Sequence, residues 1–188
     1  MPSIARRSTG PASRCANARR VTCGEESEIN DEDRNPAILT IRAAIAEWGE
    51  AFCNKNVDRL MALYAPDAVM FDAIPPFSSG ITAMRDKVAS CFPYFPDGFA
   101  VDTRDLTLEV GGEMALAHFV WHFTDLPADH PAGKHWLRSS IVWRLQPDGG
   151  WLIVHDHCSA PFDPYTERVV LDPDAPVDQA TAANCSDH

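Results

Sequence analysis

A single carboxylate at the end of an apolar strand is the residue best placed to do chemistry. A tight turn at residues 65–67 leads to the predicted strand Ala68–Asp72, and Pro75 and Pro76 follow almost at once. A carboxyl group in apolar surroundings has a raised pKa and can serve as a general base. Asp72 could instead cap the loop after it by accepting backbone hydrogen bonds. The sequence leaves both interpretations open.

Asp156 is the second acid that could take part. It lies in the last predicted strand, where alternation places Val154, Asp156 and Cys158 on one face. Together with Asp72 it would form an acid–base pair, in which the different surroundings of the two carboxyl groups give them different pKa values. The alternative is a structural carboxylate at the rim of the site, paired with an arginine of the preceding strand.

Aromatic residues could line a binding site beside these acids. Such a hollow would suit a flat, apolar, ring-containing molecule, although buried aromatic residues more often belong to a core or an interface. His122 could polarise a substrate carbonyl group. Arg138 stands alone on an otherwise apolar strand and could bind a carboxylate on a ligand or on a partner subunit. The aromatic candidates are Trp48, Phe52, Tyr64, Phe77 and Trp143.

The elements that must position these residues follow from the sequence pattern. Asn35 and Pro36 are typical of a helix start, and apolar residues then recur at helical spacing to about residue 53. A second, shorter helix follows Asn56 and includes Tyr64 on its inward side, and a third spans Ile81–Cys91. Four strands come next, with glycine-rich hairpin turns, at residues 99–110, 113–125, 134–145 and 151–158. Helices followed by antiparallel strands form the α+β pattern.

Length and composition bound the domain organisation. The chain has 188 residues, which is enough for one domain with a sizeable core. Residues 1–34 are polar, first rich in arginine and then acidic, and we expect a disordered leader there. The folded domain is expected at 35–165, and a disordered, proline- and aspartate-containing tail at 166–188.

The charge distribution excludes some partners. The formal net charge is −11 although residues 1–24 hold five arginines and no acid, so the domain itself is strongly acidic. Such a body repels phosphate backbones, and nucleic-acid binding is not expected. No apolar run approaches the roughly 20 residues of a membrane span. The six cysteines form no CxxC pair and their spacing suggests no metal site, so reduced thiols in a cytoplasmic protein are the simplest account. The sequence contains no nucleotide-binding motif, and no cofactor is expected.

Two segments resemble a known family in the right order. The first is ALYAPDAVMFD, followed by two prolines and Gly80-x-x-Ala83-Met84-Arg85-Asp86, and the second is IVWRLQPDGGWLIVHDHCSAPF. They resemble the SnoaL-like and ketosteroid isomerase-like branch of the nuclear transport factor 2-like (NTF2-like) superfamily over about residues 36–165. The second segment is also similar to the association domain of calmodulin-dependent kinases. The resemblance implies a cone-shaped α+β barrel, with a curved antiparallel sheet wrapped around three N-terminal helices, usually as a homodimer.

The resemblance also implies roles for single residues. Asp72 falls on the position of the general base that moves a proton between carbons in ketosteroid isomerases. Trp48 falls on the position of one oxyanion donor, and Ile141 on that of the other. Ile141 cannot donate, and loss of an oxyanion donor costs about two to three orders of magnitude in rate. An efficient steroid isomerase is therefore not expected.

Two functional hypotheses follow. The first is a SnoaL-like protein that binds a small apolar or carbonyl-containing ligand and catalyses cofactor-independent proton transfer with Asp72 as the base. The reaction would be isomerisation, dehydration or cyclisation of a small cyclic or polyketide-like carbonyl compound. The second is a non-catalytic, dimerising association or ligand-sensing module, which the missing donor at Ile141 favours. They differ in whether Asp72 faces an open cavity or caps the loop around Ile74 and Phe77.

Overall fold

The structure is a computed structural model of the chain and describes residues 35–74, 78–163 and 168–169. The predicted leader, 1–34, lies outside these residues, and so does most of the predicted tail. Two residues of that tail, Arg168–Val169 (β8), pair in antiparallel fashion with Phe162–Asp163 (β7). A short β-ladder therefore reaches beyond the predicted domain end at residue 165.

The first two helices begin where the sequence predicts. In α1 (Pro36–Cys53) the side-chain oxygen of Asn35 accepts a hydrogen bond from the Ala37 N–H at 3.0 Å. Asn56 caps α2 (Val57–Met61) in the same way. α2 ends before Tyr64, so the prediction that Tyr64 belongs to this helix is wrong: Tyr64 is buried as the first residue of a strand. The buried face of α1 carries Ile38, Ile41, Ile45, Ala51 and Phe52.

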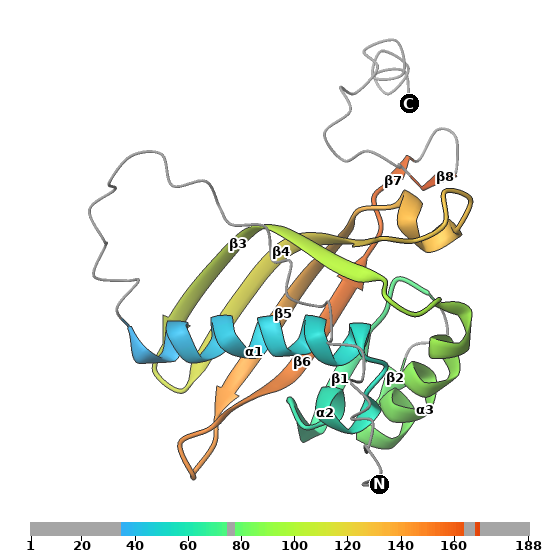
Figure 1. The fold of residues 1–188 in the computed structure, drawn as a ribbon. Coiled ribbons are helices and arrows are strands. Elements are labelled where there is room, and N and C mark those ends of the chain that lie inside the picture. The colour runs from blue at the N-terminus through green and yellow to red at the C-terminus, as the bar shows by residue number, and fades with distance from the viewer. Residues whose placement is uncertain (1–34, 75–77, 164–167, 170–188) are drawn as a thin grey trace, which may run out of the picture.

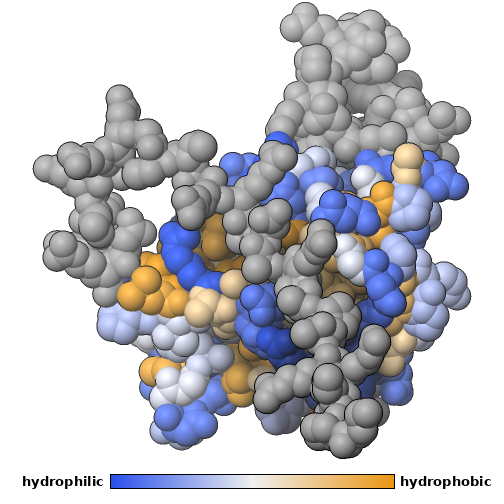
Figure 2. Space-filling model, viewed as in Figure 1, coloured by the Kyte–Doolittle hydropathy of each residue, from blue (hydrophilic) through white to orange (hydrophobic). Residues whose placement is uncertain are grey.

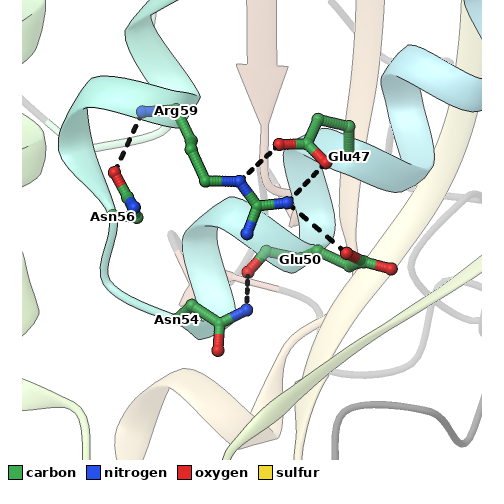
Figure 3. A network of polar contacts seen from close by, with 5 residues as sticks. All are labelled: Glu47, Glu50, Asn54, Asn56 and Arg59. Carbon is green, nitrogen blue, oxygen red and sulfur yellow. Dashed lines mark hydrogen bonds and ion pairs between the residues drawn. The ribbon is translucent and has the colours of Figure 1, made fainter. Parts of the chain in front are cut away.

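Arg59 connects α2 to the end of α1 through ion pairs (Figure 3). Its guanidinium donates to the Glu47 carboxylate at 2.7 and 2.6 Å and lies 3.5 Å from the Glu50 carboxylate. The Asn54 amide donates to the backbone carbonyl of Glu50 at 2.7 Å. These groups are exposed to solvent, and exposed ion pairs add little to stability. Their role is to fix the turn between the two helices.

Six strands form one mixed sheet in the order β2-β1-β6-β5-β4-β3. All neighbours are antiparallel except β1 and β6, which run parallel, so the prediction of a wholly antiparallel sheet is corrected at this pair. The strands are β1 (Tyr64–Phe71), β2 (Ser78–Ser79), β3 (Ala100–Gly111), β4 (Met114–Thr124), β5 (Leu137–Leu145) and β6 (Trp151–Ser159). Helix α3 (Ile81–Cys91) stands between β2 and β3. Single 3₁₀ turns lie at Phe92–Tyr94 and Pro131–Lys134, and the second includes Lys134, the predicted start of the strand that begins at Leu137.

The sheet has an inner face, on which the α-helices lie, and an outer face on the opposite side (Figure 1). Strand β4 shows the alternation, because Phe119 and Trp121 are buried on the inner face while Val120 and His122 point outward. On the helical side of the molecule, hydrophilic residues are interspersed with smaller hydrophobic patches (Figure 2). This is the α+β architecture expected from the order of the elements.

Aromatic rings fill the space between α1 and the inner face. Phe52 stacks on Trp48 with ring centroids 5.4 Å apart, and it meets four more rings at 5.2–6.1 Å. Edge-to-face and offset arrangements of this kind add to the stabilisation from burial. The four further rings belong to Phe92, Phe95, Phe99 and Phe123.

An irregularity in β1 replaces the predicted turn at 65–67. Tyr64 pairs with Ile153 of β6, and the next aligned pair is Val69 with His155. The residues between them form a bulge within the strand rather than a turn before it. The bulge lets Tyr64 keep its place on the inner face at the start of the strand.

Strand β6 carries a second bulge. Val154 is an extra residue opposite β5, between Ile153 and His155. The alternation restarts after it, so Ile153 and Asp156 are buried on the inner face and Val154 is only half-buried. The prediction that Val154, Asp156 and Cys158 share one face is therefore wrong for Val154, because a bulge inverts the phase of a strand.

Candidate functional site

Asp156 is the buried acid of the described domain, and it is hydrogen-bonded to Tyr64. The Tyr64 hydroxyl lies 2.7 Å from Asp156 Oδ2, and the Trp48 indole N–H donates to the Tyr64 oxygen at 3.1 Å. Only 6% of Asp156 and 5% of Tyr64 is exposed. Arg144 pairs with Asp67 at 2.7 Å and not with Asp156, which the structure places inside rather than at the rim.

Burial controls the proton equilibria of this pair. It raises the pKa of Asp156 to about 6; the hydrogen bond from Tyr64 opposes the rise, and the charge of Asp72 adds to it. Burial, followed by the charge of Asp156, holds the pKa of Tyr64 well above its usual range. Tyr64 therefore stays protonated near neutral pH, while Asp156 can lose and gain a proton. A carboxyl group with a pKa near the working pH is suited to general acid–base catalysis.

Asp72 caps the loop that follows it. Its Oδ1 accepts the Ile74 backbone N–H at 3.0 Å, and its Oδ2 lies 3.1 Å from Lys87 Nζ of α3. Lys87 also donates to the Ile74 carbonyl at 2.6 Å. The Asp72 side chain is 28% exposed, so the apolar surroundings predicted for it are wrong. It is still close enough for its charge to raise the pKa of Asp156.

Two predicted site residues lie on the outer face, away from Asp156. The His122 ring lies tilted against the Trp136 ring with centroids 4.0 Å apart, and its Nε2 lies 3.5 Å from Asp102. Arg138 is exposed on the same face of the neighbouring strand β5. Neither side chain can contact a molecule bound at Asp156, because the sheet stands between them.

The predicted aromatic lining forms a packed cluster. Phe52 and Trp143 are buried in the core, and Phe77 lies outside the described residues. The buried indole N–H of Trp143 has no hydrogen-bond acceptor among the described residues. Two hollows of the surface lie elsewhere, one beside the start of α3 and one at the β4–β5 connection. Neither is lined by Asp156 or Tyr64.

Two further polar side chains on the inner face, Trp121 and Ser139, are hydrogen-bonded to each other. The Trp121 indole N–H donates to Ser139 Oγ at 2.9 Å, and Ser139 sits beside Cys158 in the ladder. Burial raises the pKa of the Cys158 thiol to about 12, with further contributions from the charges of Asp156 and Asp72. A thiol of this kind is a poor nucleophile near neutral pH. Within residues 35–74, 78–163 and 168–169, no three His, Cys, Asp or Glu side chains are grouped to hold a metal.

Comparison with known proteins identifies the domain. Residues 41–163 match the family model of the SnoaL-like domain. The chain belongs to the SnoaL-like family. A solved NTF2-like protein of unknown function from Pseudomonas putida KT2440 is 30% identical, with a TM-score of 0.65 over 72% of this chain and 94% of that one. The family resemblance read from the two sequence segments is confirmed.

More distant structures share the SnoaL-like fold. A ketosteroid isomerase-like protein from Erwinia carotovora atroseptica is 17% identical, with a TM-score of 0.55 over 66% of this chain and 96% of that one. A protein from Thiobacillus denitrificans, described as a calcium/calmodulin-dependent protein kinase type II association domain, is 20% identical. Its TM-score is 0.54, over 66% of this chain and 96% of that one. The comparison with curated proteins gave no significant match.

The buried acid of the SnoaL-like domain is thus Asp156, which the sequence suggests only as a second candidate after Asp72. Asp156 and Tyr64 are 92 residues apart in the sequence, and no sequence signal indicates their hydrogen bond. None of the helices that the structure describes is long and apolar enough to cross a membrane.

Proposed function

We propose that this SnoaL-like protein binds a small carbonyl-containing compound and catalyses proton transfer with Asp156 as its general acid and base. The observation that carries the proposal is the buried hydrogen bond between Asp156 and Tyr64, at a site where burial raises the pKa of the Asp156 carboxyl group to about 6. The reaction class is isomerisation, dehydration or cyclisation, as predicted from the sequence. The base is Asp156 rather than Asp72, because both oxygens of Asp72 are engaged by Ile74 and Lys87.

The proton moves in a balanced cycle. The Asp156 carboxylate takes a proton from a carbon next to the substrate carbonyl, and the C–H electron pair shifts toward the carbonyl oxygen. The protonated acid then returns that proton to another carbon, or to a departing hydroxyl group as water forms. Tyr64 keeps its own proton throughout because its pKa lies far above the working range. The aromatic cluster beside Trp48 supplies apolar surroundings that suit a ring-containing substrate.

Turnover by two aspartate variants tests the proposal. A panel of cyclic and polyketide-like ketones is screened for proton–deuterium exchange by NMR, with the wild type, Asp156→Asn and Asp72→Asn. We expect Asp156→Asn to lose about 10²–10⁴-fold in rate, the usual contribution of a positioned general base. Asp72→Asn should lose much less of the rate, because Asp72 affects Asp156 only through its charge. Full activity in Asp156→Asn together with inactivity in Asp72→Asn would assign the base to Asp72.

A second candidate function is a dimerising association or ligand-sensing module. The observation that favours it is a group of apolar side chains exposed on the outer face of the sheet. Exposed apolar patches mark interaction surfaces. A second copy of the chain, related by a two-fold axis, would cover this face and form a homodimer. The exposed residues are Val69, Phe71, Met114 and Leu116.

The location of the protein in the cytoplasm stays a prediction.

A matched pair of leucine variants tests the homodimer. Leu116 on the outer face is 37% exposed, and Leu39 on α1 is 54% exposed. We expect Leu116→Asp to convert a dimer to a monomer in sedimentation velocity, because it buries a charge in the interface. Leu39→Asp should leave the dimer intact. A wild-type monomer at high protein concentration, or equal behaviour of both variants, would rule out this interface.

A further inference from the structure

We propose that Trp48 and Tyr64 form a one-way hydrogen-bond relay that holds Asp156 in a single orientation and leaves its Oδ1 as the reactive atom. The inference rests on the proposed function only in taking Asp156 as the acting acid. Trp48 is a positioning residue in this scheme, since it contacts Asp156 only through Tyr64.

The direction of the relay follows from the donors. An indole N–H can donate and cannot accept, so the 3.1 Å contact must run from Trp48 to the Tyr64 oxygen. The Tyr64 hydroxyl has one proton of its own, and the partner at 2.7 Å is Oδ2 of Asp156. Because Tyr64 stays protonated, this proton points to Oδ2. Both bonds therefore run toward the acid.

The relay decides which oxygen of Asp156 titrates. A proton placed on Oδ2 would force the Tyr64 hydroxyl to turn to another acceptor, and Tyr64 is only 5% exposed. Leaving a buried hydroxyl without an acceptor costs about 1–3 kcal/mol. Protonation at Oδ1 keeps both hydrogen bonds intact. Oδ1 is thus the atom that exchanges protons with a substrate.

Packing holds the first member of the relay in place. The Trp48 ring stacks on Phe52 at 5.4 Å and meets the Trp121 ring edge-on at 5.5 Å. Trp121 cannot replace it as a donor, because its own N–H is engaged by Ser139. The indole N–H therefore faces the Tyr64 oxygen as a preorganised donor. By polarising the hydroxyl group, it strengthens the bond that Tyr64 donates to the Asp156 carboxylate.

The Asp156 pKa, measured by carboxyl-carbon NMR without substrate, tests the relay. The proteins are the wild type, Tyr64→Phe, Trp48→Phe and the double variant, with Asp156→Asn for assignment. Loss of the Tyr64 bond should raise the Asp156 pKa by about one unit or more, since hydrogen bonds to charged groups contribute about 1.5–3 kcal/mol. Trp48→Phe should raise it by less. The double variant should match Tyr64→Phe alone, because Trp48 has no route to the acid without Tyr64.

Controls separate the relay from general loosening of the core. Trp136→Phe removes an indole from the outer face and should leave the Asp156 pKa unchanged. An unchanged Asp156 pKa in Trp48→Phe would overturn the relay. So would a Trp48→Phe substitution that shifts the Asp156 pKa equally in the wild type and in Tyr64→Phe. Absence of turnover with every ketone tested would count against the proposed function alone, because the pKa measurement needs no substrate.

Discussion

Asp156→Asn is expected to stabilise the folded protein by about 3 kcal/mol at pH 8, because burial raises the pKa of Asp156 in the folded wild type from the ordinary value of 3.8 to about 6. The sign follows from the direction of the shift. A carboxyl group with a raised pKa contributes stability that is complete below the unfolded value and is lost as the pH rises through the folded value. Above pH 6 the wild type carries a buried charge that asparagine does not, and the asparagine side chain can still accept the hydrogen bond from Tyr64.

Urea denaturation at pH 8 and pH 4.5 measures this gain. The difference in the free energy of unfolding between variant and wild type should fall at pH 4.5 to about a third of its value at pH 8. At pH 4.5 the wild-type carboxyl group is protonated in the folded state. Asp97→Asn is the control: Lys55 lowers the pKa of this exposed acid, so its replacement should give no gain. A gap of equal size at both pH values would show that the pKa of Asp156 is not raised. A stabilising change that also removes activity is the usual mark of an acid kept for function.

Phe52→Ala is expected to destabilise the domain by about 3–5 kcal/mol, the range for deletion of a buried aromatic side chain. Phe52 is only 8% exposed and meets rings from α1, β4 and the segment between α3 and β3. No single neighbour can collapse into the space that its removal would leave. The free energy of unfolding, from urea denaturation followed by circular dichroism, gives the value.

Two companion variants bound this result. Tyr94→Ala removes a ring that is 77% exposed and should change the stability by less than about 0.5 kcal/mol. Phe52→Leu should lose clearly less than Phe52→Ala, because it fills most of the cavity. A loss of under 1 kcal/mol in Phe52→Ala would mean that the aromatic cluster is loosely packed.

Most of the fold could be predicted because its signals are local. Asn35 and Asn56 cap their helices, and glycine-containing turns join β3 to β4 and β5 to β6. These features act over a few residues and are visible in the sequence. The parallel pairing of β1 with β6 is not, since the two strands are separated by most of the domain and nothing near either strand specifies the partner.

The site was predicted less well for the same physical reason. Asp156 and Tyr64 were each singled out, but their hydrogen bond depends on two bulges that no pattern indicated. Asp72 was expected to be the base because it ends an apolar strand. Its partner Lys87 comes from a separate helix, and so the ion pair could not be read from the local sequence.

The extra residue in β6 also changes how this strand must be compared with those of its relatives. A strand that lost one residue between Ile153 and Asp156 would lie flat against β5 and would still present both side chains to the interior. Loss of a residue after Asp156 would instead send Cys158 to the opposite side. Spacing along the chain is therefore a poor guide to equivalence here, and related proteins are better aligned by the direction in which each side chain points.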